Sequence, residues 1–182
     1  MCLELAASAV DSFGWPTGRS CDSSASVCTW GCWVHRVLAS NPVGIRYGSD
    51  VTDAEIVSRY YDLFNRGDWD GMCALLAEDV AHDLNQGERQ VGRAGFRAFL
   101  ARMERSYRET LRDVVVMSGA GGRVAAEYLV DGEYLATDEG LPPAAGQRYS
   151  LAGGAFFEVA GGCIRRVTNY YNLEDWLRQV GA

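Results

Sequence analysis

The amino-acid sequence predicts an α+β fold, in which a cone-shaped, curved antiparallel sheet wraps around helices that come earlier in the chain. Apolar residues recur at helical spacing in three stretches between residues 53 and 108. From Leu111 onward the pattern becomes that of strands, and turns rich in glycine or proline separate the runs. Helices followed by antiparallel strands are typical of α+β domains. A curved sheet over a few helices encloses a cavity, so we expect a small-molecule pocket there.

Composition restricts the possible partners of this chain. It has 182 residues, of which 48% are hydrophobic, and a formal net charge of −7. Such a chain lacks the basic patch that neutralises phosphates, so we expect neither a nucleic-acid partner nor binding to an anionic membrane. No apolar stretch reaches the ~20 residues that span a bilayer. The first ten residues carry no positive charge, unlike a signal peptide, and we expect a cytoplasmic protein.

The first 50 residues differ in character from the rest. Serine, glycine, cysteine and tryptophan are scattered there without periodicity, so we expect 1–50 to be a poorly ordered extension, or translated upstream sequence, and 51–182 to form the domain. Cys28, Cys32 and His35 are conceivable metal ligands. Their spacing matches no common zinc module and a fourth ligand is not obvious, so we expect no metal site.

Capping residues predict where several helices begin and end. Thr52 to Glu55 is a capping box for the first helix, and Gly67 is placed to end that helix. Asp68 then caps a short second helix. Near the end of the chain, Asn172 is placed to cap a final helix.

A short strand before the third helix carries the candidate site. Because side chains alternate along a strand, Asp83 and Asn85 share one face and His82 points to the other. The helix that follows has Phe96 and Phe99 on its apolar stripe. A carboxylate and an amide backed by an aromatic helix predict the wall of a pocket. His82 lies across the strand from Asp83, so we expect it at the surface or at a subunit interface.

Several of these residues admit two interpretations. Asp83 is either a pocket base whose pKa is raised by apolar walls or a strand-end carboxylate that binds turn amides. Asn85 either orients a carbonyl group or only makes the turn. The Glu127 side chain either points into the cavity enclosed by the cone-shaped sheet or lies on a solvated strand face. Asn169 and Tyr171 form either a wall for a ring-shaped ligand or part of a subunit interface.

Two stretches connect these elements to a known family. They are RYYDLFNRGDWDG at residues 59–71 and HDLNQGERQVGRAGFRAFL at residues 82–100. In this order they resemble the nuclear transport factor 2-like superfamily, and within it the ketosteroid-isomerase-related, SnoaL-like branch. The resemblance covers residues 51–180. It implies a cone-shaped α+β barrel, usually a homodimer, with a pocket between sheet and helices.

The resemblance also implies roles for two residues. Tyr60 matches a tyrosine that donates in the oxyanion hole of ketosteroid isomerases, and Asp83 is the nearest match to their catalytic base. From the residues alone, Tyr60 is an amphipathic core tyrosine. A slip of one residue along the strand would turn Asp83 outward. Gly154 stands where the isomerases have a second acid, and losing such a donor costs about 10²–10³ in rate, so we do not expect steroid isomerisation.

Two functions of different classes remain. The first is a cofactor-independent isomerase or cyclase in which Asp83 moves a proton beside a small apolar carbonyl and Tyr60 binds the enolate. Its substrate would be bound by the other candidate residues, Asn85, Phe96, Phe99, Glu127, Asn169 and Tyr171. The alternative is a non-catalytic module of the same fold that binds a hydrophobic ligand or dimerises. A weaker third option is hydrolysis by a water held between Asp83 and Asn85.

Overall fold

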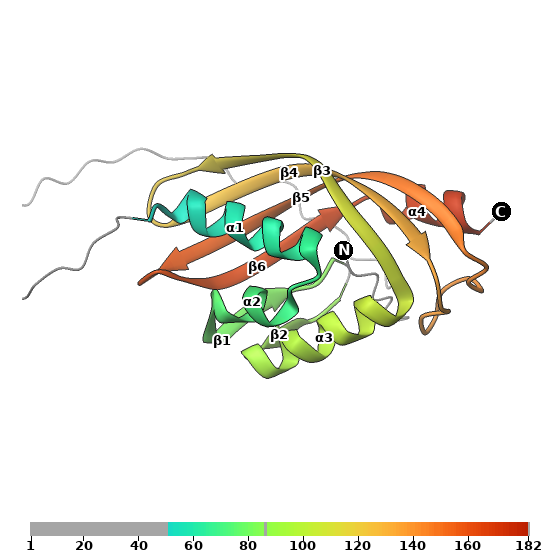
Figure 1. Cartoon of the computed structure of the whole chain (residues 1–182), viewed down its shortest axis with the longest axis horizontal. Helices are drawn as coiled ribbons and strands as arrows, with labels where there is room; N and C mark the ends of the chain where they lie inside the picture. Colours follow the sequence, from blue (N-terminus) through green and yellow to red (C-terminus); the bar gives the residue numbers. More distant parts are fainter. Residues whose placement is uncertain (1–50, 86, 182) are drawn as a thin grey trace, which may run out of the picture. The chain divides into compact units, whose positions relative to one another are not determined.

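A six-stranded, curved and unclosed sheet forms the centre of the domain (Figure 1), in the strand order β2-β1-β6-β5-β4-β3. The computed structural model describes residues 51–85 and 87–181, so the expectations for residues 1–50 lie outside the described part. The strands are β1 (Leu76–Asp83), β2 (Arg89–Val91), β3 (Tyr107–Ser118), β4 (Arg123–Tyr134), β5 (Gln147–Ala160) and β6 (Cys163–Tyr171). The helices are α1 (Asp53–Arg66), α2 (Trp69–Ala74), α3 (Arg93–Ser106) and α4 (Leu173–Val180).

Strand pairing departs from the expected run of antiparallel strands at one place. β3, β4, β5 and β6 pair antiparallel in succession, and β2 pairs antiparallel with β1. β1, however, lies parallel to β6, with Asp83 opposite Thr168. The helix and four strands that separate β1 from β6 in the chain make this possible, because parallel neighbours need a long connection.

The predicted caps of α1 and α2 are confirmed. Thr52 Oγ1 accepts from the Glu55 backbone N–H at 3.2 Å, and Glu55 Oε2 accepts from the Thr52 N–H at 2.7 Å. Gly67 ends α1 in the left-handed conformation with φ 67°, and the Asp68 side chain caps α2. These local signals determine where α1 stops and how the chain turns into α2.

The helices cover one face of the sheet, which we call the inner face, and bury the core against it. α1 lies along this face over β3 to β6, and α3 packs near β1 and β2 (Figure 1). At the far end, Trp176 of α4 is fully buried and packs edge-on against Tyr134 and Tyr149. We call the opposite face of the sheet the outer face.

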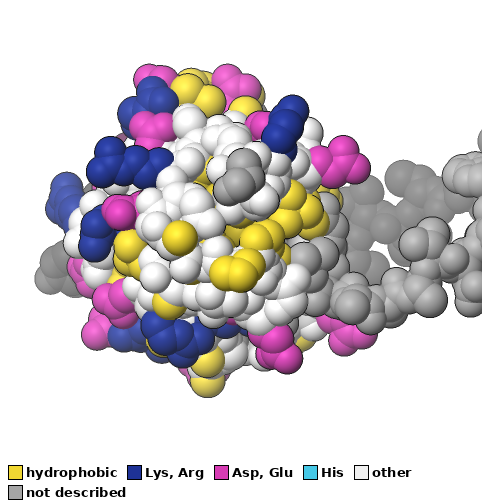
Figure 2. All heavy atoms as spheres, turned by 90° about the vertical axis from the view of Figure 1, so that its right-hand side faces the viewer, with side chains coloured by type: hydrophobic (Ala, Val, Ile, Leu, Met, Phe, Trp, Pro, Cys, Tyr) yellow, Lys and Arg dark blue, Asp and Glu magenta, His cyan; other side chains and the backbone are white. Residues whose placement is uncertain are grey.

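Charges of both signs are distributed over the surface. On the face shown in Figure 2, arginine side chains and carboxylates alternate around a central area with hydrophobic side chains. This mixture agrees with an acidic chain that presents no broad cationic surface there. None of the helices in the described part of the chain is long and apolar enough to cross a membrane.

The turn between β3 and β4 provides a test of backbone packing. Gly121 and Gly122 both have positive φ, 65° and 73°. A Cβ on Gly122 would overlap the Val159 carbonyl oxygen, whereas one on Gly121 would meet nothing. We expect both alanine variants to lose the ~1 kcal/mol of a left-handed residue, and Gly122→Ala to lose about 1–3 kcal/mol more through the overlap. Urea unfolding of the two variants measures the difference, and equal losses would contradict the close approach.

Candidate functional site

The side chains of β1 alternate between the two faces of the sheet at the candidate site. Val80, His82 and Leu84 are buried on the inner face, whereas Ala81 and Asp83 are only partly buried and point to the outer face. The predicted alternation is therefore confirmed. The face that lines the interior is, however, the one that carries His82. The expectation that Asp83 forms the pocket wall is wrong, because Val80 and Leu84 take the inner face.

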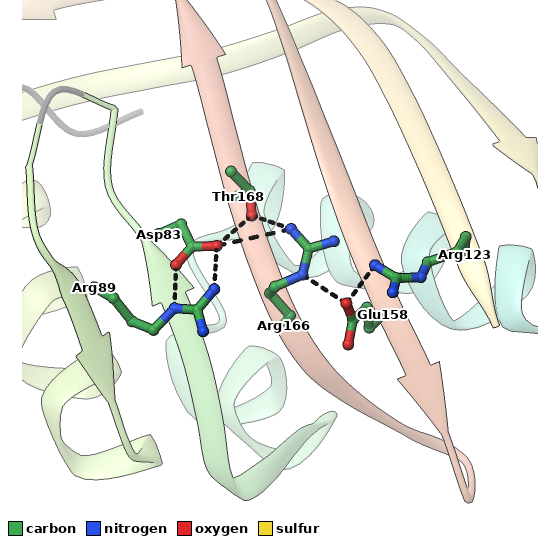
Figure 3. A network of polar contacts seen from close by, with 6 residues as sticks. All are labelled: Asp83, Arg89, Arg123, Glu158, Arg166 and Thr168. Carbon is green, nitrogen blue, oxygen red and sulfur yellow. Dashed lines mark hydrogen bonds and ion pairs between the residues drawn. The ribbon is translucent and has the colours of Figure 1, made fainter. Parts of the chain in front are cut away.

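Asp83 belongs instead to an ionic network on the outer face (Figure 3). Arg89 donates to both carboxylate oxygens, with Nε–Oδ1 2.6 Å and Nη2–Oδ2 3.0 Å, and Thr168 Oγ1 donates to Oδ2 at 2.8 Å. Arg166 approaches to 3.7 Å and also binds Glu158. The hydrogen bonds from Arg89 in particular hold the pKa of Asp83 below its usual value, so the interpretation of Asp83 as a pocket base with a raised pKa is contradicted.

An interior cavity lies between α1, α3 and the inner face of the sheet. Its volume is about 30 Å³. By volume it has room for about one or two water molecules and no more. The residues that line it are Tyr60, Tyr61, Phe64, Met72, Phe99, Leu100, Met103, Leu111, Tyr128 and Asn169. None of these described lining residues is ionised at neutral pH, so the cavity is apolar apart from three hydroxyl groups and one amide.

The three tyrosines supply hydrogen-bond donors to this cavity. The Tyr61 hydroxyl is buried and makes no hydrogen bond of good geometry, although the Tyr128 hydroxyl is near enough to interact with it. Tyr128 Oη lies 3.5 Å from Asn169 Oδ1, at the limit of a hydrogen bond. Burial raises the pKa of Tyr60, Tyr61 and Tyr128 well above the usual value. All three hydroxyls therefore stay protonated at neutral pH and can donate to an oxygen atom of a ligand.

Three of the predicted site residues line the cavity, namely Tyr60, Phe99 and Asn169. The oxyanion-type role proposed for Tyr60 stays a prediction. Its ring packs edge-on against Phe157 and Tyr61 in the core, as the amphipathic interpretation expects.

The other predicted residues lie elsewhere. Asn85 Nδ2 donates to the Tyr171 backbone carbonyl at 3.2 Å, which ties the end of β1 to the end of β6. Tyr171 packs half-buried against the core without lining the cavity. Phe96 is buried behind the cavity wall. Glu127 is exposed on β4, so its solvated interpretation is correct.

His82 is the residue whose placement the sequence interpretation missed. Its side chain is 1% exposed, and neither ring nitrogen has a hydrogen-bond partner. The imidazole centroid lies 4.6 Å from the Phe96 ring and 4.5 Å from the Phe99 ring. Burial lowers the pKa of His82 to about 4. The sequence contained the signal for this placement. Val80 and Leu84 are apolar and lie two residues before and after His82, so all three side chains share one face of the strand.

A surface groove of about 380 Å³ lies next to the interior cavity. Phe64 and Met103 line both spaces, so these two side chains separate the cavity from the groove. Trp69 also lines the groove and packs edge-on against Phe64. An unbranched methionine such as the one at this boundary can change rotamer at low cost.

Metal-binding groups do not accumulate in the described residues. No group of three histidine, cysteine or acidic side chains is placed to hold a metal ion in the ranges 51–85 and 87–181. Cys73 and Cys163 are free thiols. The conceivable ligands Cys28, Cys32 and His35 lie outside these ranges.

Comparisons with known proteins agree on the fold. Residues 57–167 match the model of the SnoaL-like domain family. A candidate polyketide cyclase from Pseudomonas putida KT2440 is 59% identical; the match covers 71% of this chain and 98% of that one, with a TM-score of 0.70. A second candidate polyketide cyclase, from Xanthomonas campestris pv. campestris, is 62% identical over 70% of this chain and 95% of its own, with a TM-score of 0.68.

A more distant solved structure shows the same architecture. An NTF2-like protein from Burkholderia xenovorans LB400 is 18% identical over 70% of this chain and 95% of that chain, with a TM-score of 0.58, which supports the fold alone. No protein with a curated description matches. The family match and the two highly similar structures show that this chain belongs to the SnoaL-like family of the nuclear transport factor 2-like superfamily.

Proposed function

We propose that this protein is an isomerase or cyclase that moves a proton beside the carbonyl group of a small apolar compound, without a cofactor. The observation that carries the proposal is the buried Tyr61 hydroxyl, which makes no hydrogen bond of good geometry and interacts only with the Tyr128 hydroxyl in a largely apolar cavity. A buried hydroxyl without a partner costs about 1–3 kcal/mol of stability. A ligand oxygen at this place would satisfy it, together with the hydroxyls of Tyr60 and Tyr128.

The chemistry of the cavity supports a carbonyl ligand. A carbonyl oxygen only accepts hydrogen bonds, and the tyrosine hydroxyls stay protonated because burial raises their pKa. When a proton leaves the neighbouring carbon, the oxygen becomes an enolate and its hydrogen bonds strengthen in the apolar surroundings. The two highly similar structures are described as candidate polyketide cyclases, and ring closure of a compound with two carbonyl groups would begin with such an enolate.

Ligand entry requires the cavity to enlarge. A volume of about 30 Å³ holds no organic ring, so side chains must move apart. Phe64 and Met103 are placed for this movement, because they lie between the cavity and the groove of about 380 Å³. We propose that the ring of the ligand enters here and that any polar end stays in the groove, beside Asn65 and Glu104.

We also propose that the chain forms a homodimer through the outer face of the sheet. Phe156 and Tyr170 are 52% and 53% exposed there, and their rings pack edge-on with centroids 5.8 Å apart. A groove of about 600 Å³ beside them also contains Met117 and Arg123. Exposed aromatic pairs usually mark an interface. The nearby charges of both signs, Arg123 and Glu158, suit a two-fold contact in which each patch meets its own copy.

Replacement of Tyr61 by phenylalanine tests the donor cluster. We expect Tyr61→Phe to weaken the binding of 2-naphthol, an enol-like probe, by about 3–10-fold, because one hydrogen bond is worth about 0.5–1.5 kcal/mol. The free energy of unfolding should stay the same or rise, since the lost hydroxyl makes no hydrogen bond of good geometry in the unliganded protein. Fluorescence titration and urea unfolding measure the two quantities. Tyr170→Phe on the outer face is the matched control, and equal affinity in both variants would contradict the proposal.

Introducing a charged side chain on the outer face tests the proposed homodimer interface. Light scattering of the wild type should give twice the chain mass of 19.9 kDa. Phe156→Asp should give the monomer mass, because an ionised carboxylate within an apolar interface loses its hydration. Val91→Asp places the same charge at another exposed apolar residue, on β2, and should leave the dimer intact. A monomeric wild type, or a dimeric Phe156→Asp variant, would exclude this interface.

A further inference from the structure

The most unusual group in the described core is the imidazole of His82. It is 1% exposed, and both of its ring nitrogens are buried without hydrogen-bond partners. The large majority of buried side-chain polar atoms in proteins have a partner, and the exceptions require an explanation. An apolar side chain between Phe96 and Phe99 would fill the same space without this cost. Packing alone therefore does not account for a histidine at this position.

The position of His82 connects it to the proposed site. It lies on the inner face of β1, the face from which the cavity is built. Its ring contacts Phe99 at a centroid distance of 4.5 Å with the planes nearly perpendicular, and Phe99 itself lines the cavity. Phe99 therefore contacts both the imidazole of His82 and the cavity that Tyr61 and Tyr128 line.

We infer that His82 is the proton acceptor of this site and is reached by the substrate when the Phe99 ring moves aside. The inference rests on the proposed function and identifies the residue that accepts the proton, which the proposed function does not name. In the reaction, a C–H bond beside the carbonyl breaks and its proton goes to an imidazole nitrogen. The electron pair moves to the carbonyl oxygen, which the tyrosine hydroxyls bind. The imidazolium then returns the proton to another atom of the same molecule, so the step is balanced without an oxidant or reductant.

The basicity of His82 suits this task. Burial lowers its pKa to about 4, which is close to the value of a free carboxylate, about 4. Among the described residues, two charges also act on the ring: Asp83, on the opposite face of the strand, opposes the shift, and Arg102 of α3 adds to it. The imidazole is neutral at physiological pH and therefore ready to accept a proton.

Hydrogen–deuterium exchange of 2-indanone tests the inference on the full chain. This apolar ring ketone exchanges its acidic C–H protons with D₂O, and NMR follows the loss of signal. We expect the wild type to accelerate the exchange, with a rate that falls as the pH drops through about 4. His82→Phe and His82→Gln should each lower the protein-dependent rate at least about 100-fold, the contribution of a general base. Both variants should keep their affinity for 2-naphthol within threefold.

Asp83→Asn is the control that separates the possible bases. It should keep the exchange rate within about twofold, because Asp83 faces away from the cavity. Full exchange in His82→Phe together with loss in Asp83→Asn would overturn the role of His82 and leave the proposed function standing. A wild type that binds 2-naphthol and never accelerates exchange would overturn both.

A second measurement needs no substrate. The chain has two histidines, so ¹⁵N NMR of a histidine-labelled sample contains two imidazoles, and the spectrum of His82→Gln assigns them. The His82 ring should remain neutral down to below pH 5. Titration near the ordinary value of about 6.5 would mean that the ring is solvated and would remove the basis of the inference.

Discussion

The alternation of side chains along β1 is the constraint on which this site depends. Because Val80 and Leu84 are buried, His82 must share their face and Asp83 must point to the other. A slip of one residue would expose both apolar side chains and move an ionised carboxylate into the core, at a cost of several kcal/mol. The hydrogen bonds from Arg89 on β2 to both carboxylate oxygens of Asp83 also favour this register, on the outer face of the sheet. The outer network therefore helps to position the inner site, although its exposed arginine limits the energy that it contributes.

The cavity combines two properties that usually oppose each other. It is largely apolar, which strengthens any hydrogen bond made inside it, and it contains the Tyr61 hydroxyl, which makes no hydrogen bond of good geometry in the unliganded protein. A core of the same volume built only from apolar side chains would be more stable. In the proposed function, an oxygen atom of the ligand would accept a hydrogen bond from the Tyr61 hydroxyl. In the proposed function, a rotamer change of Met103 at the boundary with the groove would open this core without unfolding of a helix or strand.

The sequence predicted the elements whose signals are local. Thr52, Gly67 and Asp68 act through hydrogen bonds within a few residues, and their caps appear as expected. The parallel pairing of β1 with β6 depends on contacts between residues far apart in the chain, which periodicity does not encode. The face of the sheet to which the Asp83 side chain points is a different case. The apolar neighbours of His82 indicated the correct face, but the resemblance to an enzyme with an aspartate base favoured the other.

A neutral base has a physical advantage over a carboxylate at this place. An ionised carboxylate in an apolar cavity must either be hydrogen-bonded or take up a proton, and in the second case it ceases to be a base. A neutral imidazole loses much less hydration on burial, and its resting form is already the one that accepts a proton. The same burial that lowers the pKa of His82 to about 4 brings its basicity to that of a carboxylate. An apolar wall of phenylalanines and an uncharged base are thus compatible, and Asp83 is left to stabilise the outer face of the sheet.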